Sequence, residues 1–334
     1  MTPNLSFDDV LIVPQYSDIQ SRTEIDISNN LGKLNLSLPV LSAPMDSVTE
    51  SVMVTAMAKN GGLGIIHRYN TIQKQVKIAK KSRTPVVAAA VGVTGDYLDR
   101  AVALYNAGVK IICVDVAHGH HVLMRHALEV LRNTLGTQVT IIAGNVATLQ
   151  AFNDLSDWGA DAVRVGIGGG SICSTRIQTG HGVPTLQSVL DCAGSDRPAK
   201  LIADGGIKNS GDIVKAYAAG ADFVMLGSML AGTTETPGDI SYKQFPGQCN
   251  PSKIKVYRGM ASEDGKSSSV EGVATTIPYK GHVKNILRSI ERGIKSGFSY
   301  SGARSFTEFQ AKAQLIQQTA SSQIESSTHI ERIN

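Results

Sequence analysis

The chain has 334 residues, of which 42% are hydrophobic and 18% charged, and its formal net charge at pH 7 is +4. This length and apolar content allow a large buried core, which excludes a disordered or fibrous protein. The basic residues are scattered, so the charge argues against nucleic acid as a partner and is compatible with a pocket for a small anion.

The first residues, MTPNLSFDDVLIVP, lack the basic flank and apolar run of a signal peptide, and no stretch approaches 18 consecutive apolar residues. The four cysteines are too few and too far apart for a disulfide framework or a zinc knuckle. We therefore expect a soluble cytoplasmic protein with free thiols and no membrane partner.

Eight short apolar or β-branched runs follow one another along the chain, with helical periodicity between them. In order, they are residues 38–44, 62–67, 85–91, 110–117, 139–146, 162–167, 200–207 and 222–228. Eight βα units predict an α/β protein with a single (β/α)₈ TIM barrel, whose active site lies on the loops after the strands. A doubly wound open sheet is the alternative.

Two segments lie outside these units. Residues 229–280 are rich in Gly, Pro, Ser and Thr and have little periodicity, which predicts a functional lid. Residues 319–334 are polar and are expected to form a flexible tail. The predicted organisation is one catalytic barrel over residues 1–318, including the lid, followed by this tail.

The loops after the seventh and eighth strands predict a phosphate site. Barrel enzymes often bind phosphate there with backbone N–H groups at a helix start. Gly205, Gly206 and Gly227 would let an anion approach the backbone, and Ser228 adds a hydroxyl donor. Asp204 would accept hydrogen bonds from a ribose diol. Together these residues favour a nucleoside monophosphate over the alternative that the glycines only form tight turns.

The sixth strand is followed by GIGGGSICSTR, residues 166–176, which contains a candidate nucleophile. Cys173 would face the barrel mouth, where helix-start amides favour a reactive thiolate. Thr175 could exchange a proton at the same reacting centre. Cys113, Cys192 and Cys249 are interpreted as small buried hydrophobes.

A short loop carries His118, His120 and His121. No carboxylate stands near them at the spacing of a zinc site, so a hydrogen-bonding role is favoured over metal binding.

The chain resembles the IMP dehydrogenase and GMP reductase family from about residue 5 to residue 305. The matching motifs are FDDVLIVPQYSD, LSAPMDSVTE, AGNVAT, GIGGGSICSTR, ADGGIKNSGDI, GSMLAG, YRGM, EGV and PYKG. The resemblance implies a (β/α)₈ barrel that forms homotetramers. It also implies a cysteine that bonds covalently to C2 of a purine nucleotide, and hydride exchange between that carbon and a nicotinamide.

The same resemblance assigns residue roles, motif by motif. Cys173 is the nucleophile, and Thr175 with Glu271 handles protons. The residues that would hold phosphate and ribose are Ser171, Asp204, Gly206, Gly227, Ser228 and Tyr257. Those bordering the base are Met45, Gly259 and Met260. Two residues, Asp115 and Ala117, would lie beside the nicotinamide of the cofactor. Two others, Tyr300 and Gly302, could reach the cofactor of a neighbouring subunit.

Two positions depart from the family pattern. Gly169 stands where Pro or Ser is usual, and Ser174 where Thr or Ile is usual. Both changes are expected to reshape the cysteine loop without removing its chemistry.

Two reactions remain to be separated within this family. The dehydrogenases activate water with an Arg-Tyr pair on a flap after YRGM, whereas residues 261–270 here read ASEDGKSSSV. The only Arg-Tyr dipeptide, Arg68–Tyr69, follows the second strand and so lies outside that flap. The regulatory insert usual after the second strand of dehydrogenases is also missing. HRY and DVAHGH are closer to the reductase pattern, whereas the N-terminal third and the PYKG region are closer to a dehydrogenase.

These features favour a GMP reductase that uses NADPH, with an NAD-dependent IMP dehydrogenase as the alternative. A purine-nucleotide-binding barrel without turnover is a third interpretation, which the intact Cys173, Thr175 and Glu271 disfavour. The sequence leaves open whether a monovalent cation such as K⁺ binds at Gly168, Gly170 and Cys173. No other metal site is expected.

Overall fold

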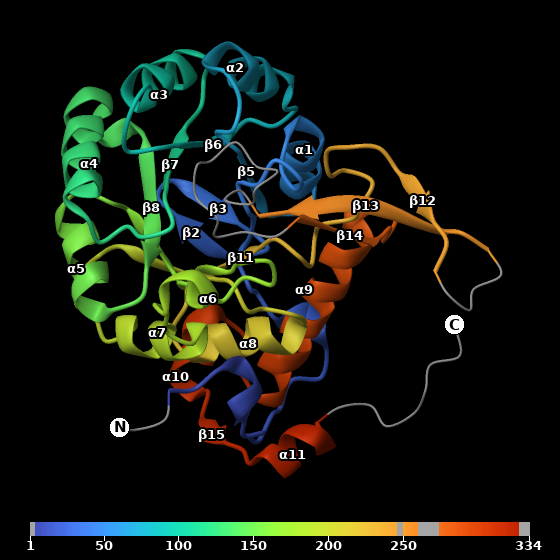
Figure 1. Cartoon of the computed structure of the whole chain (residues 1–334). Coiled ribbons are helices and arrows are strands. Elements are labelled where there is room, and N and C mark those ends of the chain that lie inside the picture. Colours follow the sequence, from blue (N-terminus) through green and yellow to red (C-terminus); the bar gives the residue numbers. More distant parts are fainter. Residues whose placement is uncertain (1–3, 246–249, 260–273, 327–334) are drawn as a thin grey trace.

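The computed structural model describes residues 4–245, 250–259 and 274–326. Its centre is a closed barrel of parallel strands in the order β10-β11-β4-β5-β6-β7-β8-β9, which confirms the predicted (β/α)₈ barrel (Figure 1). The strands are β4 (Val40–Ser42), β5 (Leu63–Ile66), β6 (Ala88–Val91), β7 (Ile111–Asp115), β8 (Thr140–Val146), β9 (Ala162–Val165), β10 (Lys200–Asp204) and β11 (Phe223–Leu226). Each lies within one of the eight runs predicted from the sequence.

Buried side chains pack inside the barrel. One buried cluster contains Leu41, Ala90 and Phe223 together with Leu31 and Leu36. The last two belong to an antiparallel hairpin of β2 (Asn29–Leu31) and β3 (Leu34–Leu36). This hairpin closes the end of the barrel where the strands begin, which leaves the opposite end for the site.

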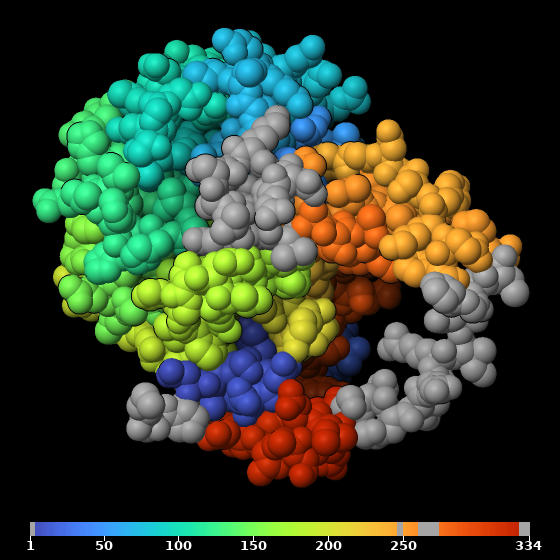
Figure 2. All heavy atoms as spheres, viewed as in Figure 1, coloured from blue at the N-terminus to red at the C-terminus, as the bar shows by residue number. Residues whose placement is uncertain are grey.

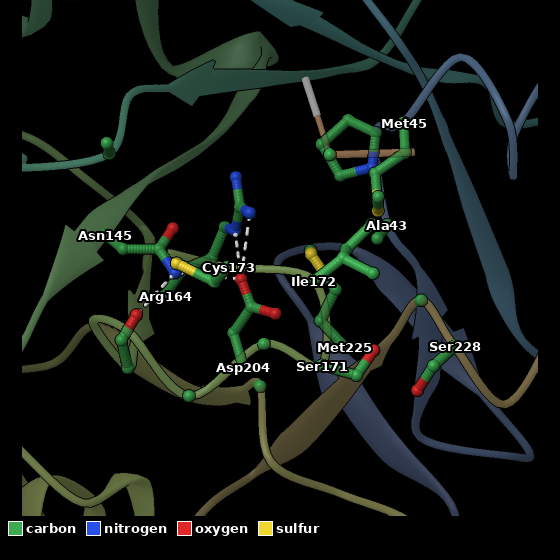
Figure 3. A pocket seen from close by; sticks show the side chains of 18 of the residues that line it. Ala43, Met45, Asn145, Arg164, Ser171, Ile172, Cys173, Asp204, Met225 and Ser228 are labelled. Atoms are coloured by element: carbon green, nitrogen blue, oxygen red, sulfur yellow. Dashed lines mark hydrogen bonds and ion pairs between the residues drawn. The ribbon is translucent and has the colours of Figure 1, made fainter. Parts of the chain in front are cut away.

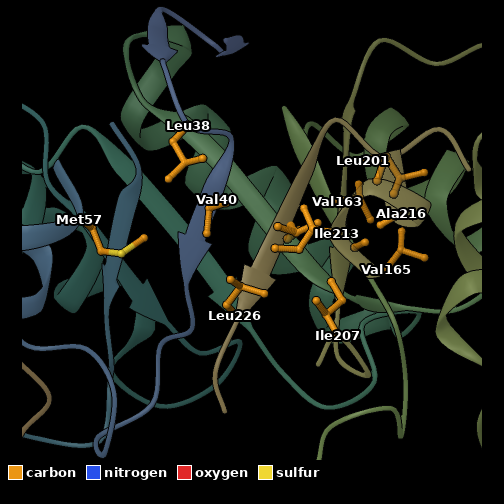
Figure 4. Packing of buried hydrophobic residues seen from close by; sticks show 14 of the residues in the cluster. Leu38, Val40, Met57, Val163, Val165, Leu201, Ile207, Ile213, Ala216 and Leu226 are labelled. Carbon is orange, nitrogen blue, oxygen red and sulfur yellow. The ribbon is translucent and has the colours of Figure 1, made fainter. Parts of the chain in front are cut away.

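Helices surround the barrel and bury its outer face. Figure 4 shows Val40 and Leu226 from the strands beside Met57, Ile213 and other buried side chains. The helices are α1 (Ser51–Lys59), α2 (Ile72–Lys81), α3 (Tyr97–Asn106), α4 (Val122–Leu135), α5 (Leu149–Asp157), α6 (Thr175–Thr179), α7 (Thr185–Cys192), α8 (Ser210–Ala218) and α9 (Val283–Tyr300). Because α9 packs against both α8 and α1, it completes the ring. Within the described residues, none of the helices combines the length and apolarity needed to span a membrane.

The segment predicted as a lid contains an antiparallel sheet that the sequence did not predict. Its strands are β12 (Ser241–Lys243), β13 (Ser252–Arg258) and β14 (Ala274–Pro278). The sheet stands at the edge of the ring, orange beside the blue of α1 in Figure 2. Lys255 on β13 is buried and donates hydrogen bonds from Nζ to the carbonyl oxygens of Thr233 and Thr236, at 3.2 and 2.6 Å. These bonds attach the sheet to the loop after the last barrel strand.

Two segments from opposite parts of the sequence, near the first and last described residues, pair with each other. Strand β1 (Val10–Ile12) pairs antiparallel with β15 (Leu315–Gln317), next to α10 (Phe306–Lys312). Within the predicted tail, Ala320–Glu325 forms α11, and residues 327–334 lie outside the described residues. The flexibility of the tail stays a prediction. The remaining elements are three short 3₁₀ helices, η1 (Phe7–Asp9), η2 (Arg22–Glu24) and η3 (Gly136–Gln138).

Candidate functional site

The loops at the carboxyl ends of the barrel strands enclose a cleft of about 420 Å³. Its walls come from the loops after β4, β5, β7, β9, β10 and β11, from Asn145 on β8 and from the end of β13. Figure 3 shows labelled side chains from several of these segments around one space, among them Cys173, Asp204, Met45 and Ser228. This is the end of the barrel at which the sequence placed the active site.

The loop between β9 and α6 carries the candidate nucleophile. The Cys173 thiol is half-buried and donates a hydrogen bond to the Thr175 hydroxyl, with 3.1 Å between Sγ and Oγ1. The backbone N–H of Cys173 donates to the carbonyl oxygen of Gly170 at 3.1 Å. Because α6 begins at Thr175, the thiol lies just before the first turn of that helix. The predicted pairing of Cys173 with Thr175 is thus present in the structure.

Glycines allow this loop to lie close to its neighbours. Gly166 has φ +143°, and a Cβ there would come within 2.0 Å of the carbonyl oxygen of Asp204. A Cβ at Gly169 would lie 2.3 Å from the Oγ1 of Thr185. The departure from the family pattern at Gly169 therefore has a local cause, since any larger residue would displace the loop or Thr185.

A charged residue that the sequence analysis did not select lies beneath the cleft. Arg164, on β9, is 6% exposed and forms ion pairs with Asp115 and Asp204, the latter at 2.8 Å. Burial by itself would lower the pKa of this guanidinium, but the carboxylates of Asp204 and Asp115 hold the pKa well above its ordinary value. The amide of Asn145 also donates to Asp204, at 2.9 Å. The sequence does contain a signal for this residue, because Arg164 interrupts the otherwise apolar run AVRVGI, residues 162–167.

These contacts orient two carboxylates that the sequence assigned to different ligands. Asp115 was expected at the nicotinamide and Asp204 at the ribose. Both line the cleft, and Arg164 connects them. Each carboxylate keeps oxygen lone pairs that can accept hydrogen bonds from a ligand.

The predicted phosphate side of the cleft contains hydroxyl groups and exposed backbone. Tyr257, on β13, forms a side-chain hydrogen bond with Ser171. Burial raises the pKa of Tyr257 and the bond to Ser171 lowers it, with burial the larger effect, so the phenol remains a donor at neutral pH. A Cβ on Gly227 would lie 3.2 Å from the Tyr257 hydroxyl and 3.3 Å from the sulfur of Met45. Gly206 and Ser228 line the same cleft.

The other cysteines differ from Cys173. Cys113 and Cys192 are 0% and 1% exposed, and burial raises the pKa of each thiol to about 12. Their interpretation as buried hydrophobes is confirmed. Cys249 lies outside the described residues.

The dipeptide Arg68–Tyr69 lies outside the flap in the sequence, but in the structure it forms part of the cleft wall. Arg68 and Tyr69 line the cleft, with the Arg68 guanidinium 4.9 Å from the centre of the Tyr69 ring and 3.8 Å from an Asp115 oxygen. Burial and the charge of Asp115 raise the pKa of Tyr69 to about 12. The phenol is therefore protonated at neutral pH and is a poor base.

Several assigned residues lie elsewhere. Met260 and Glu271 are outside the described residues, so their roles stay predictions. Gly259 and Ala117 line the cleft, whereas Tyr300, which is 63% exposed at the end of α9, and Gly302 do not. Their expected contact with a neighbouring subunit's cofactor remains a prediction.

The histidine loop and the cysteine loop were considered in the sequence analysis as possible metal sites. His120 contacts Asp154 at 2.7 Å and stacks on Trp158, and no group of three potential ligands occurs among the described residues. At the proposed cation position, the Gly170 carbonyl accepts from the Cys173 amide. This contact does not test the K⁺ prediction.

Comparisons with known proteins extend over the whole chain. A family model described as "IMP dehydrogenase / GMP reductase domain" matches residues 4–329. The inosine-5′-monophosphate dehydrogenase of Nitrosopumilus maritimus is 34% identical, with 97% of this chain and 98% of that protein covered. The GMP reductase of Leishmania major is 30% identical, with 97% and 96% covered. Both alignments are longer than this chain, 474 and 483 residues against 334, so both relatives contain internal segments without a counterpart here.

A solved structure has the same fold. It is a GMP reductase variant from Trypanosoma brucei in complex with guanosine 5′-monophosphate, with a TM-score of 0.92 and 30% identity, and the alignment covers 99% of each chain.

Proposed function

This chain belongs to the IMP dehydrogenase and GMP reductase family, and we propose that within this family it is a GMP reductase that converts GMP to IMP and ammonia with NADPH. The family places it among oxidoreductases of purine nucleotides. The observation that carries the proposal is the contact between Cys173 and Thr175, which both line the cleft. Hydroxyl groups line the side of the cleft proposed for the phosphate. On the other side, Tyr69 is protonated at neutral pH and so offers no base for water.

The substrate would lie with its phosphate among Ser171, Tyr257 and the backbone at Gly227, where hydroxyl and N–H donors converge without a buried cation. Asp204 would accept hydrogen bonds from the ribose hydroxyls, since Arg164 and Asn145 hold it in place. The base would then extend past Met45 toward Cys173. The solved GMP reductase from Trypanosoma brucei, which has GMP bound, supports a purine nucleotide in this cleft.

The reaction begins with attack of the Cys173 sulfur on C2 of the guanine base, which forms an S–C2 bond. The 2-amino group then leaves as ammonia, and a protonated neighbour has to supply its proton. Thr175 is in contact with the thiol and can relay that proton. Glu271 is the predicted source of the proton. After C2 is reduced, the S–C2 bond breaks, the thiolate returns to the enzyme and IMP is released.

The residues on the other side of the cleft fit a nicotinamide cofactor. Asp115 and Ala117 line the same space as Cys173, and Arg164 and Arg68 fix the Asp115 carboxylate. A bound reduced nicotinamide would supply the hydride that reduces C2. The Arg68–Tyr69 wall would exclude water from this side, which protects a covalent adduct from hydrolysis.

The alternative is an NAD-dependent IMP dehydrogenase, because relatives of both kinds match along nearly the whole chain. That reaction requires a base that activates water to hydrolyse the adduct. Arg68 is held between Asp115, at 3.8 Å, and the Tyr69 ring, and Tyr69 is protonated at neutral pH, which disfavours this role for both. Arg258 is paired with Asp46, and Arg304 with Asp18, which makes them equally unsuitable.

A nicotinamide absorbance assay in both directions separates the two reactions. We expect sustained consumption of NADPH with GMP. With IMP and NAD we expect at most one turnover of reduced cofactor per site and negligible steady-state xanthosine monophosphate. Glu271→Gln should slow the reductive direction by roughly 10²–10⁴-fold, as is typical of lost acid-base help. Sustained formation of xanthosine monophosphate would reassign the protein to the dehydrogenases.

We further propose a cytoplasmic homotetramer, in which Tyr300 and Gly302 reach a neighbouring subunit's cofactor. Sedimentation analysis of the full chain with and without nucleotide tests the assembly.

A further inference from the structure

A second cleft lies on the outer wall of the barrel, away from the strand ends. It has a volume of about 320 Å³ and lies between η2 and α9, which pack against each other. Its lining residues are Arg22, Thr23, Arg288, Glu291, Arg292 and Lys295. None of these residues lines the cleft that contains Cys173. We propose that this outer cleft binds an anion with several adjacent phosphate groups, such as a nucleoside triphosphate or free polyphosphate.

The charge of the lining supports an anion of high charge. Four cationic side chains face one carboxylate, which leaves three positive charges in excess (4 − 1). The carboxylate of Glu291 is paired with Lys295 at 2.9 Å. Arg22, Arg288 and Arg292 form no ion pair with any residue that the structure describes.

The nearest other acidic groups already have partners. Glu24, on η2, accepts from the backbone N–H of Ser21 at 2.8 Å and pairs with Arg304 at 3.4 Å. Asp18 also pairs with Arg304, at 2.9 Å. The three guanidinium groups thus remain without an ion-pair partner among the described residues, and an external anion can supply the missing charge.

The geometry favours phosphate groups over a single small anion. Arg288, Arg292 and Lys295 stand at positions i, i+4 and i+7 of α9, so they share one face of the helix, and Arg22 faces them from η2. Neighbouring positions on such a face have Cβ atoms about 5–6 Å apart. A guanidinium fork matches two phosphate oxygens, and one phosphate group carries at most about two negative charges. Three forks at this spacing therefore match two or three linked phosphates better than one.

The test is isothermal titration of the full chain with sodium tripolyphosphate at low salt, where screening is weak. The variant Arg288→Gln/Arg292→Gln removes two unpaired cations from the cleft. Its matched control, Lys77→Gln/Lys284→Gln, removes the same charge from exposed positions on α2 and α9 outside the cleft. Both pairs of side chains are exposed, so we expect all three proteins to fold.

We expect the native protein to bind tripolyphosphate. The arginine variant should lose at least about tenfold in affinity, because phosphate–guanidinium bonds are local and bidentate. The affinity of the control should change by less than about twofold. Two further titrations use ATP and adenosine in place of tripolyphosphate. Tighter binding of ATP than tripolyphosphate identifies a nucleotide, equal binding identifies polyphosphate, and adenosine should not bind at this cleft.

Three results would overturn the proposal. They are no binding of tripolyphosphate to the native protein, equal losses in both variants, and native affinity in the arginine variant.

Discussion

The sulfur of Cys173 lies 3.1 Å from the hydroxyl oxygen of Thr175, at the start of a helix and inside a cleft bordered by six barrel loops. This contact brings the proposed nucleophile and the proposed proton relay to one point, whereas the other described thiols are buried in the core. The chemistry proposed for the protein depends on this difference, and the first two predictions test it.

Cys173→Ala should abolish turnover of GMP while leaving GMP binding within about threefold of the native affinity, because the proposed phosphate and ribose contacts at Tyr257, Gly227 and Asp204 come from other segments. Stopped-flow absorbance measures turnover, and equilibrium titration measures binding. The matched control is Cys192→Ala, which removes a buried thiol far from the chemistry and should keep most of the activity. Substantial turnover without Cys173 would exclude the covalent mechanism.

Thr175→Val should lower kcat by roughly 10²–10⁴-fold, since it removes the hydroxyl that contacts the thiol and keeps the side-chain shape. Thr175→Ser keeps the hydroxyl and should retain activity within about tenfold of the native rate. KM for GMP should change little in either variant. If valine keeps most of the native kcat while serine loses it, the side-chain methyl group matters and the hydroxyl does not.

Arg164→Met should lower the free energy of unfolding by about 3–5 kcal/mol, because Asp115 and Asp204 then face each other without their buried cation. Urea denaturation measures the change. Adding Asp115→Asn and Asp204→Asn to this variant should recover part of the loss. Arg197→Met, at the exposed pair with Asp157, is the control and should leave the midpoint nearly unchanged. Equal midpoints for Arg164→Met and the native chain would contradict the electrostatic role.

Stability should fall as the pH rises above 9. Burial raises the pKa of Cys113 and Cys192 from 9.0 to about 12, so above pH 9 the unfolded chain releases thiol protons that the folded chain retains. The stabilising contribution is complete below pH 9 and is lost as the pH approaches 12. Each thiol gives a slope of at most about 1.4 kcal/mol per pH unit.

Urea midpoints at pH 8, 9 and 10 measure this slope. The double variant Cys113→Ala/Cys192→Ala should be less stable at pH 8 and should show a flatter decline from pH 9 to 10. The upper limit of pH 10 reduces the contribution of Tyr69 and Tyr217, whose pKa values are also raised by burial. An unchanged slope in the double variant would mean that other groups control the alkaline transition.

The sequence by itself determined the barrel and the place of the nucleophile. Runs such as residues 139–146 and 222–228 are continuously apolar at their centres, IIA at 141–143 and FVML at 223–226, which is the pattern of strands buried on both faces. Since parallel strands bring their following loops to one end, the position of Cys173 after the sixth strand and of Gly227 after the eighth was sufficient to place both at the mouth. The motif match supplied the remaining residue roles.

Only the tertiary structure decided which side chains meet beneath and beside that mouth. Arg164 lies 49 residues from Asp115 and 40 from Asp204, and their association depends on the closed register of β7 to β10. Arg68–Tyr69 reaches the cleft because β5 stands beside β4 in the same ring, although its sequence position is remote from Cys173. No local pattern encodes such contacts, because they arise when the barrel closes and brings distant loops within a few ångströms of one another.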